Sequence, residues 1–392
     1  MKLRTWSLAA SLVIAAAPAL ARDPFSLDFF VNGELVRRSF SSVETAANAL
    51  SDVNLRSIAP GYTESSPAVA RIDLRGVQGT VSYAANSSVL QVRIPSAGLN
   101  ETFNGATREE SRKLFRRYLE GRGETNTLSQ LLRAGTSASP IDPVAGGPNS
   151  ALTQLAIADF GRATEAALDG AGGFSIGARY SGLSAGGFDS HSSTVPLGAT
   201  WRITDQDALQ LDLPLSYTET SGAASYSGNF GVLYRRKLTE NWTLQPSIRV
   251  GGAGSLDLAA GSGIYSYGLA STLRLPLADH WHVTLANSVS RVSTFPVSVG
   301  RYSVDYDLAN TVFRNGLLLS HDLPGGLGGL PLSAGAFAVD TRLTGSPTYV
   351  RNFQEIGGYI SAGRDQRFTL GASYLTGARG LSGLVVTASA RF

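Results

Sequence analysis

Residues 208–218, ALQLDLPLSYT, alternate between two kinds of side chain. The apolar set is Leu209, Leu211, Leu213, Leu215 and Tyr217, and the polar set is Gln210, Asp212, Ser216 and Thr218. Successive side chains of a β-strand point to opposite faces, so this segment predicts a strand with one apolar and one wet face. Such a strand suits a barrel wall with lipid outside and water inside.

The same alternation recurs from Phe174 to the end of the chain, for example in residues 195–203 and 242–250. Tight polar turns, such as residues 204–207, alternate with looser Gly/Ser-rich connections, such as residues 183–191, which we expect to be longer outer loops. Counting the segments predicts about twelve strands, an even number that places both ends of the barrel in the periplasm. Residues 310–320 and 349–362 alternate poorly, so counts of about ten or fourteen stay open.

The last segment, residues 384–392 (LVVTASARF), has alternating apolar residues and ends in Phe392. With this ending, residues 174–392 resemble the Gram-negative outer-membrane proteins, whose last strand carries a terminal aromatic residue. The resemblance implies that Phe392 is a sorting signal read by the barrel-insertion machinery. It also implies outer-membrane lipid as the surrounding medium.

Three tryptophans lie beside the tight turns. Trp201 precedes such a turn, and Trp242 and Trp281 each follow one. Tryptophan is enriched at membrane–water interfaces, so we expect these residues to form a girdle at the inner interface.

The N-terminus has the features of an exported protein. Lys2 and Arg4 precede an apolar run at residues 8–17, and Ala19-Leu20-Ala21 follows, so residues 1–21 are predicted to be a signal peptide. A single anchoring helix is the rival interpretation, but the run is shorter than the roughly 20 residues of a membrane span.

Composition excludes several classes of function. The chain has no cysteine, which excludes disulfides and thiolate metal sites. Its 33 basic residues fall to 31 without Lys2 and Arg4, against 30 acidic ones, and this balance argues against a nucleic-acid partner.

Before the barrel, residues 22–135 are predicted to form a small α+β domain. Asn32-Gly33 between apolar residues predicts a hairpin, and Thr107 with Glu110 predicts a helix start. Residues 136–149, rich in Gly, Ser and Pro, are expected to be a linker, and residues 150–172 a plug or gating helix. The predicted fold is therefore mainly β, an antiparallel transmembrane barrel (173–392) preceded by a helix and a periplasmic domain.

A helix that leads into a barrel of about twelve strands resembles, in architecture, autotransporter translocators and functional-amyloid secretion channels. That resemblance implies a helix that occupies or gates the pore. The segment 22–135 differs from a typical autotransporter passenger, because it is short and has no repeats.

Charged residues on the presumed inner face are the candidate pore lining. They are Arg179, Arg202, Asp212, Arg235, Arg249, Arg274, Asp305, Asp307, Asp340 and Arg342. Such charges either select solutes in an open pore or pair across a closed lumen, and the sequence leaves both interpretations open.

A hydrolase is a third-ranked alternative. His191 lies near Asp189, Ser192 and Ser193, the residue types that general-base chemistry needs, but no known hydrolase signature is present. We expect no catalytic, cofactor-binding or metal-binding residue, no cofactor and no enzyme activity.

The sequence thus predicts an outer-membrane channel or export pore. The helix would be its plug. The N-terminal domain would lie in the periplasm and engage a protein cargo, unless the chain is threaded outward through the lumen. The alternative from another class is a surface-display or structural barrel, similar to a minimal autotransporter.

Overall fold

The computed structural model describes residues 22–31, 33–49, 56–57, 59–119, 127–166, 172–299, 302–304, 306–327, 330–363 and 366–392. The predicted signal peptide, residues 1–21, lies outside the described residues.

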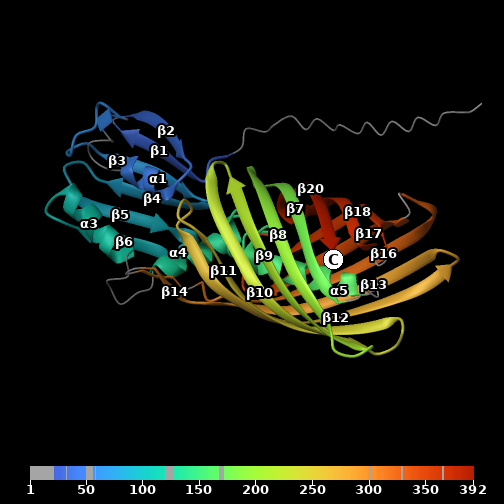
Figure 1. Ribbon diagram of the computed structural model, residues 1–392. Coiled ribbons are helices and arrows are strands. Elements are labelled where there is room, and N and C mark those ends of the chain that lie inside the picture. Colours follow the sequence, from blue (N-terminus) through green and yellow to red (C-terminus); the bar gives the residue numbers. More distant parts are fainter. Residues whose placement is uncertain are drawn as a thin grey trace, which may run out of the picture.

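Twelve antiparallel strands close into a barrel, which confirms the predicted fold class and strand number (Figure 1). The first strand, β7, pairs with the last, β20, with Tyr180 opposite Val386, and this pairing closes the wall. The strands are β7 Gly173–Ala185, β8 Phe188–Arg202, β9 Asp207–Thr220, β10 Ala223–Lys237, β11 Trp242–Ser255, β12 Ala260–Ala278, β13 Trp281–Phe295, β16 Ala309–Leu327, β17 Leu330–Gly345, β18 Asn352–Ala362, β19 Phe368–Gly377 and β20 Ser382–Arg391.

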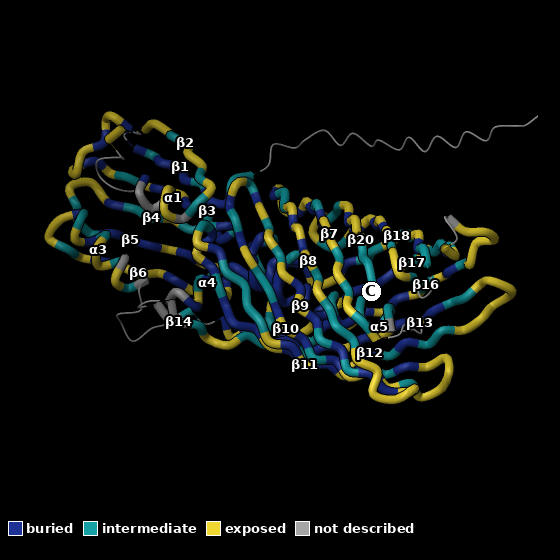
Figure 2. Tube along the Cα trace, in the orientation of Figure 1, coloured by how far each residue is buried: buried dark blue, intermediate teal, exposed yellow. Residues whose placement is uncertain are grey.

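The period-two pattern decides which side chains face outward. In β9, Leu213 and Leu215 are exposed on the outer surface, whereas Gln210 and Asp212 are buried inside. Figure 2 shows this alternation of buried and exposed residues along the barrel strands. An apolar exterior around a polar interior is the arrangement expected of a barrel in a lipid bilayer, and the fold is that of an outer-membrane β-barrel.

The barrel has two distinct ends. The terminal end carries Gly173, Phe392 and the turns at residues 203–206, 238–241 and 279–280. The loop end carries the connections at 186–187, 221–222, 256–259, 296–308, 346–351 and 378–381, including the short strands β14 Val297–Val299 and β15 Tyr302–Val304 and the 3₁₀ turn Ala378–Gly380.

Several connections at the loop end are shorter than predicted. Residues 183–191 form a continuous hairpin whose turn is only Gly186 and Gly187, with φ of +59° and +82°. These left-handed conformations suit glycine and allow a two-residue turn, so the Gly/Ser-rich stretch extends the strands instead of forming a long loop.

The N-terminal domain is a six-stranded antiparallel sheet with the order β2-β1-β3-β4-β5-β6 and helices α1, α3 and α4 packed against it. Its apolar core includes Leu27, Phe29, Leu90 and Val92. The elements are β1 Phe25–Val31, β2 Glu34–Phe40, α1 Val43–Ala49, β3 Ala68–Leu74, β4 Val77–Tyr83, β5 Val89–Ile94, the 3₁₀ turn Pro95–Ala97, β6 Leu99–Asn104, α3 Arg108–Leu119 and α4 Thr127–Ala138.

Helix α5, Ala151–Ala166, lies inside the barrel and packs against β10, β11, β12, β13 and β16 (Figure 1). The segment before it differs from the predicted linker. Residues 136–138 belong to α4, and Val144 and Ala145 are buried in the mouth of the barrel. Tertiary burial therefore overrides the local Gly/Pro composition that predicted a flexible connection.

The N-terminal domain contacts the loop end. Arg22 N–H donates to the Gly187 carbonyl (2.9 Å), Thr136 Oγ1 to the Pro347 carbonyl (2.8 Å) and Arg379 Nη1 to the Ser137 carbonyl (2.7 Å). The chain runs through the lumen as α5, so the domain lies at the end opposite to the one where β7 begins and β20 finishes. This path is the outward threading that the sequence left open, and the membrane face on which the domain lies stays a prediction.

No helix in the described part of the chain is long and apolar enough to cross a lipid bilayer.

Candidate functional site in the barrel lumen

An apolar cluster closes the loop end of the lumen, and we call it the apolar seal. Residues 139–166, which run from α4 through the lumen, are called the threaded segment. It contributes Val144, Leu152 and Leu155 to the seal, none of which is more than 1% exposed. The barrel residues that surround them are Leu183, Phe188, Ile264, Val292, Val312, Leu343, Val350, Phe353 and Leu375. These barrel side chains face inward near the loop end and pack against the three residues.

A buried polar junction joins the seal to the N-terminal domain. Asp142 Oδ2 accepts a hydrogen bond from Arg75 Nη1 (3.2 Å) and one from the Tyr306 hydroxyl (3.0 Å). Asp142 Oδ1 accepts from the backbone N–H groups of Val144 and Ala145. One fully buried carboxylate therefore connects the domain, the threaded segment and the 296–308 connection.

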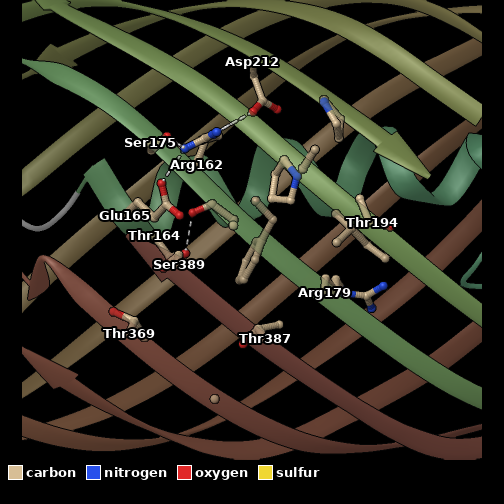
Figure 3. Close-up of a pocket in the computed structure, with 18 of the residues that line it drawn as sticks. Arg162, Thr164, Glu165, Ser175, Arg179, Thr194, Asp212, Thr369, Thr387 and Ser389 are labelled. Carbon is tan, nitrogen blue, oxygen red and sulfur yellow. Dashed lines mark hydrogen bonds and ion pairs between the residues drawn. The ribbon is translucent and has the colours of Figure 1, made fainter. Parts of the chain in front are cut away.

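An ion-pair cluster of Asp159, Arg162, Asp212 and Arg249 holds α5 lower in the lumen. From β11, Arg249 Nε donates to Asp159 Oδ1 (2.6 Å), and its Nη1 donates to Asp212 Oδ2 (2.8 Å). From α5, Arg162 Nη2 donates to Asp212 Oδ1 (2.6 Å), as Figure 3 shows. Buried charges are tolerated only when they are paired in this way, so the cluster fixes the rotation and depth of the helix.

A cavity of about 360 Å³ lies beside α5. Besides α5, the strands that line it are β7–β10, β12, β13 and β16–β20. The cavity reaches Gln366 and Arg391 at the terminal end. Its charged lining consists of Arg162, Arg179, Arg274, Arg314, Arg391, Glu165, Asp212 and Glu355.

Six of the ten predicted pore-lining residues lie on the lumen face. Arg179, Asp212 and Arg274 line the cavity, and Arg235 and Arg249 are buried in the lumen. Arg202 shares the inward side of β8 but is exposed at the terminal end.

Asp340 and Arg342 face outward, contrary to the prediction. Their strand neighbours Val339 and Thr341 are buried in the lumen, while Asp340 accepts hydrogen bonds on the outer surface from Arg342 Nε (2.8 Å) and Gln354 Nε2 (2.7 Å). Apart from Phe337, residues 333–338 of β17 are alanine, glycine and serine on both faces, so the apolar pattern does not specify which face is inside.

Asp307 is also not a pore residue. It lies at the loop end and pairs with Arg133 of α4 at 2.8 Å, with the two side chains 69% and 46% exposed. Asp305 lies outside the described residues.

Sequence reasoning missed the helix residues of the ion-pair cluster, Asp159 and Arg162, as well as Arg314 in the cavity. A usable signal existed for the first two. Asp159 and Arg162 are charged residues three positions apart in a helix made largely of apolar and small residues. Such charges need partners when the helix is buried.

The three tryptophans and Phe392 are all at the terminal end. Trp201, Trp242 and Trp281 are exposed on the outer surface next to the tight turns. Phe392 N–H donates to the Phe174 carbonyl (2.9 Å), which extends the pairing between the last and first strands. Their roles as interface girdle and sorting signal stay predictions.

The candidate hydrolase residues do not converge. His191 lies on the outer surface, with Nδ1 3.0 Å from the Tyr180 hydroxyl, whereas Ser192 is buried on the inner face. Asp189 accepts a hydrogen bond from Ser184 and not from His191. Within the described ranges, no three His, Asp or Glu side chains are grouped closely enough to hold a metal ion.

No protein-family model matches the chain, and no curated protein matches its sequence. Solved structures do resemble it. The β domain of the Bordetella autotransporter BrkA is 17% identical with a TM-score of 0.46, and the alignment covers 57% of this chain and 99% of that one.

Two further solved structures are similar. For the translocator domain of the autotransporter NalP from Neisseria meningitidis the identity is 15% and the TM-score 0.43, over 61% of this chain and 97% of that one. An outer membrane channel from Pseudomonas putida F1 is 12% identical with a TM-score of 0.39, over 56% of this chain and 96% of that one. Each resemblance is one of fold alone.

Proposed function

We propose that this protein holds its own N-terminal domain at the outer face of the outer membrane, with the connecting chain threaded through the barrel. The observation that carries the proposal is the path of the chain. The strands begin and finish at the terminal end, the domain contacts the loop end, and α5 joins the two through the lumen.

The orientation rests on the terminal end. Bacterial single-chain barrels have an even number of strands with both ends of the barrel in the periplasm. Strand β20 ends beside the start of β7 at the same end as Trp201, Trp242 and Trp281. If the terminal end faces the periplasm, the loop end and the domain on it face outward.

The lumen interactions support display of an attached domain. The apolar seal, the buried Asp142 junction and the ion-pair cluster hold the threaded segment at three successive levels. A domain that is tied to its barrel in this way remains attached after assembly, and its exposed surface is the functional surface.

A plugged channel or export pore is the second candidate, and the cavity beside α5 favours it. Its charged lining would give such a channel selectivity once the helix moved. The predicted periplasmic cargo belongs to this candidate, and the loop-end position of the domain gives it no support.

Site-specific labelling separates the two orientations, because the chain has no cysteine of its own. We would introduce Gln91→Cys on the exposed sheet of the domain and, as the matched control, Glu240→Cys in an exposed turn at the terminal end. A membrane-impermeant maleimide applied to intact cells should label only the first variant, and permeabilised cells should show both labelled. Labelling of Glu240→Cys but not Gln91→Cys in intact cells would refute the display proposal.

A further inference from the structure

We propose that the cavity beside α5 contains a binding site for a small oxyanion, a carboxylate or phosphate group, between Arg179 and Arg314. This inference goes beyond domain display, because it depends only on the lumen chemistry of the folded barrel.

Arg179 is the first observation. It projects from β7 into the cavity, as Figure 3 shows. Both terminal nitrogens of its guanidinium are buried, and neither has an acceptor among the described residues. A guanidinium carries five N–H donors and stays charged, so burial without acceptors costs far more than burial in a completed ion pair.

Arg314 of β16 lines the same cavity and is only partly satisfied. Its Nη1 donates to Thr341 Oγ1 at 2.9 Å, and its Nη2 lies 3.6 Å from Glu355 Oε2. Its Nε is buried and has no acceptor in the described part of the chain. The guanidinium lies over the Phe160 ring, with 5.1 Å from its carbon to the ring centroid, which fixes its plane beside the cavity.

Glu355 interacts electrostatically with both arginines but cannot satisfy them. One of its oxygens faces Arg314, and the other accepts a hydrogen bond from Ser373 Oγ (2.7 Å). The two guanidiniums therefore share one carboxylate. The ion-pair cluster differs, because its arginines, Arg162 and Arg249, have the carboxylates of Asp159, Asp212 and Glu165.

The surroundings fit an oxyanion. Thr194 and Thr387 lie opposite Arg179 on the neighbouring strands, and both line the cavity. The Thr387 hydroxyl can donate to the same ligand, and the Thr194 hydroxyl can do so when it accepts from Ser216 Oγ, 2.8 Å away. Arginine forks bind carboxylates and phosphates through two parallel hydrogen bonds. The cavity is large enough for a small solute and extends to the terminal end at Gln366.

The test uses residues 22–392, the chain without its predicted signal peptide, refolded in detergent. Its melting temperature would be measured against inorganic phosphate, and separately against acetate, at constant ionic strength. We expect a saturable rise with at least one of these anions, because a ligand that binds only the folded state stabilises it. Arg179→Gln should weaken the apparent affinity about tenfold or more, since it removes a charged bidentate donor. Arg202→Gln, at the exposed end of β8, is the matched control and should leave the affinity unchanged.

Glu355→Gln gives a prediction of opposite sign. It removes the negative charge that competes with the ligand, so the anion should bind more tightly than to the wild type. If Arg179→Gln does not fold, the anion affinity of Glu355→Gln tests the proposed site in its place. The proposal is overturned if neither anion gives a saturable rise, if Arg179→Gln binds as the wild type does, or if Glu355→Gln binds no more tightly.

Discussion

The two halves of the lumen are built from opposite chemistry. Toward the loop end, Val144, Leu152 and Phe353 belong to an apolar core of the kind found inside soluble proteins. Toward the terminal end, Arg249, Asp159 and their partners surround a polar cavity. Apolar contact excludes water but is not directional, whereas ion pairs require particular partners at particular distances. We therefore expect the first half to exclude water from the lumen and the second half to position the helix.

This division explains why one side of α5 can remain open. The helix is held by directional contacts to β9 and β11, so it does not need apolar packing all around. We expect the seal to be the part of the lumen that interrupts the passage. The predictions that follow test this division, starting with the largest expected effect.

Arg249→Met should be the most damaging single substitution in the lumen. It leaves Asp159 buried without an ion-pair partner and removes one partner of Asp212, so we expect a loss of about 3–5 kcal/mol in the free energy of unfolding. Urea unfolding followed by tryptophan fluorescence measures the loss. Adding Asp159→Leu to the same chain should recover part of it, and the exposed Arg202→Met is the control. A loss below about 1 kcal/mol would show that the cluster does not hold the helix.

Leu152→Ala tests the seal. Leu152 is 0% exposed, and a cavity in its place should cost about 3 kcal/mol. If the seal interrupts the passage, this variant should also show channel openings in planar bilayers more often than the wild type. Arg249→Met, which leaves the seal residues in place, should show fewer openings than Leu152→Ala. The reverse order would place the barrier to conduction in the charged half.

Tyr306→Phe tests the buried junction beside the seal. Burial raises the pKa of the Tyr306 hydroxyl well above its ordinary value, and the charge of Asp142 adds to the rise. The folded protein thus holds this proton more tightly than the unfolded chain. The resulting stability is complete below the unfolded pKa of about 10 and is lost as the pH rises toward the folded pKa.

At neutral pH we expect Tyr306→Phe to cost about 1 kcal/mol through the lost hydrogen bond to Asp142. Above about pH 10 the difference between wild type and variant should shrink, because only the wild type has this proton to lose. Unfolding curves at pH 8 and at a higher pH measure the change. A difference that stays constant or grows would contradict a buried, neutral hydroxyl.

Arg133→Ala should have the smallest effect, because the Arg133–Asp307 pair at the domain contact is largely exposed. A double-mutant cycle with Asp307→Ala is expected to give a coupling energy of about 0.2–1 kcal/mol that decreases with added salt. A much larger coupling would mean that the domain is held to the barrel mainly by surface charge and not by the junction at Asp142.

The sequence predicted the barrel well because its signal is local. The alternation in residues 208–218 correctly placed Leu215 outside and Asp212 inside, and the same pattern gave the number of strands. It failed in β17, where small residues on both faces removed the contrast that identifies the inner side. Strand β16 alternates poorly because its pattern is partly reversed. The apolar Val312 faces inward and belongs to the seal, whereas the polar Asn315 is exposed on the outer surface.

The site was harder to predict because it depends on the path of the chain. The charged residues of β9 and β11 were recognised as inward, but their partners on α5 become visible only once the helix is known to lie against those strands. The position of the domain at the loop end is also a matter of topology. Residues 139–150 have the composition of a linker, and nothing local in them indicates that they are buried inside a barrel mouth.

Because the chain is threaded through the lumen, the width of the N-terminal sheet prevents the folded domain from passing back through the barrel. Six paired strands are about 24 Å wide, whereas the lumen is already occupied by one helix of about 10–12 Å diameter. The folded domain therefore cannot be withdrawn through the closed barrel. It must cross as an unfolded chain before its sheet forms, or before β20 pairs with β7. Once both are folded, the two parts are interlocked, and a pull on the domain would have to unfold one of them.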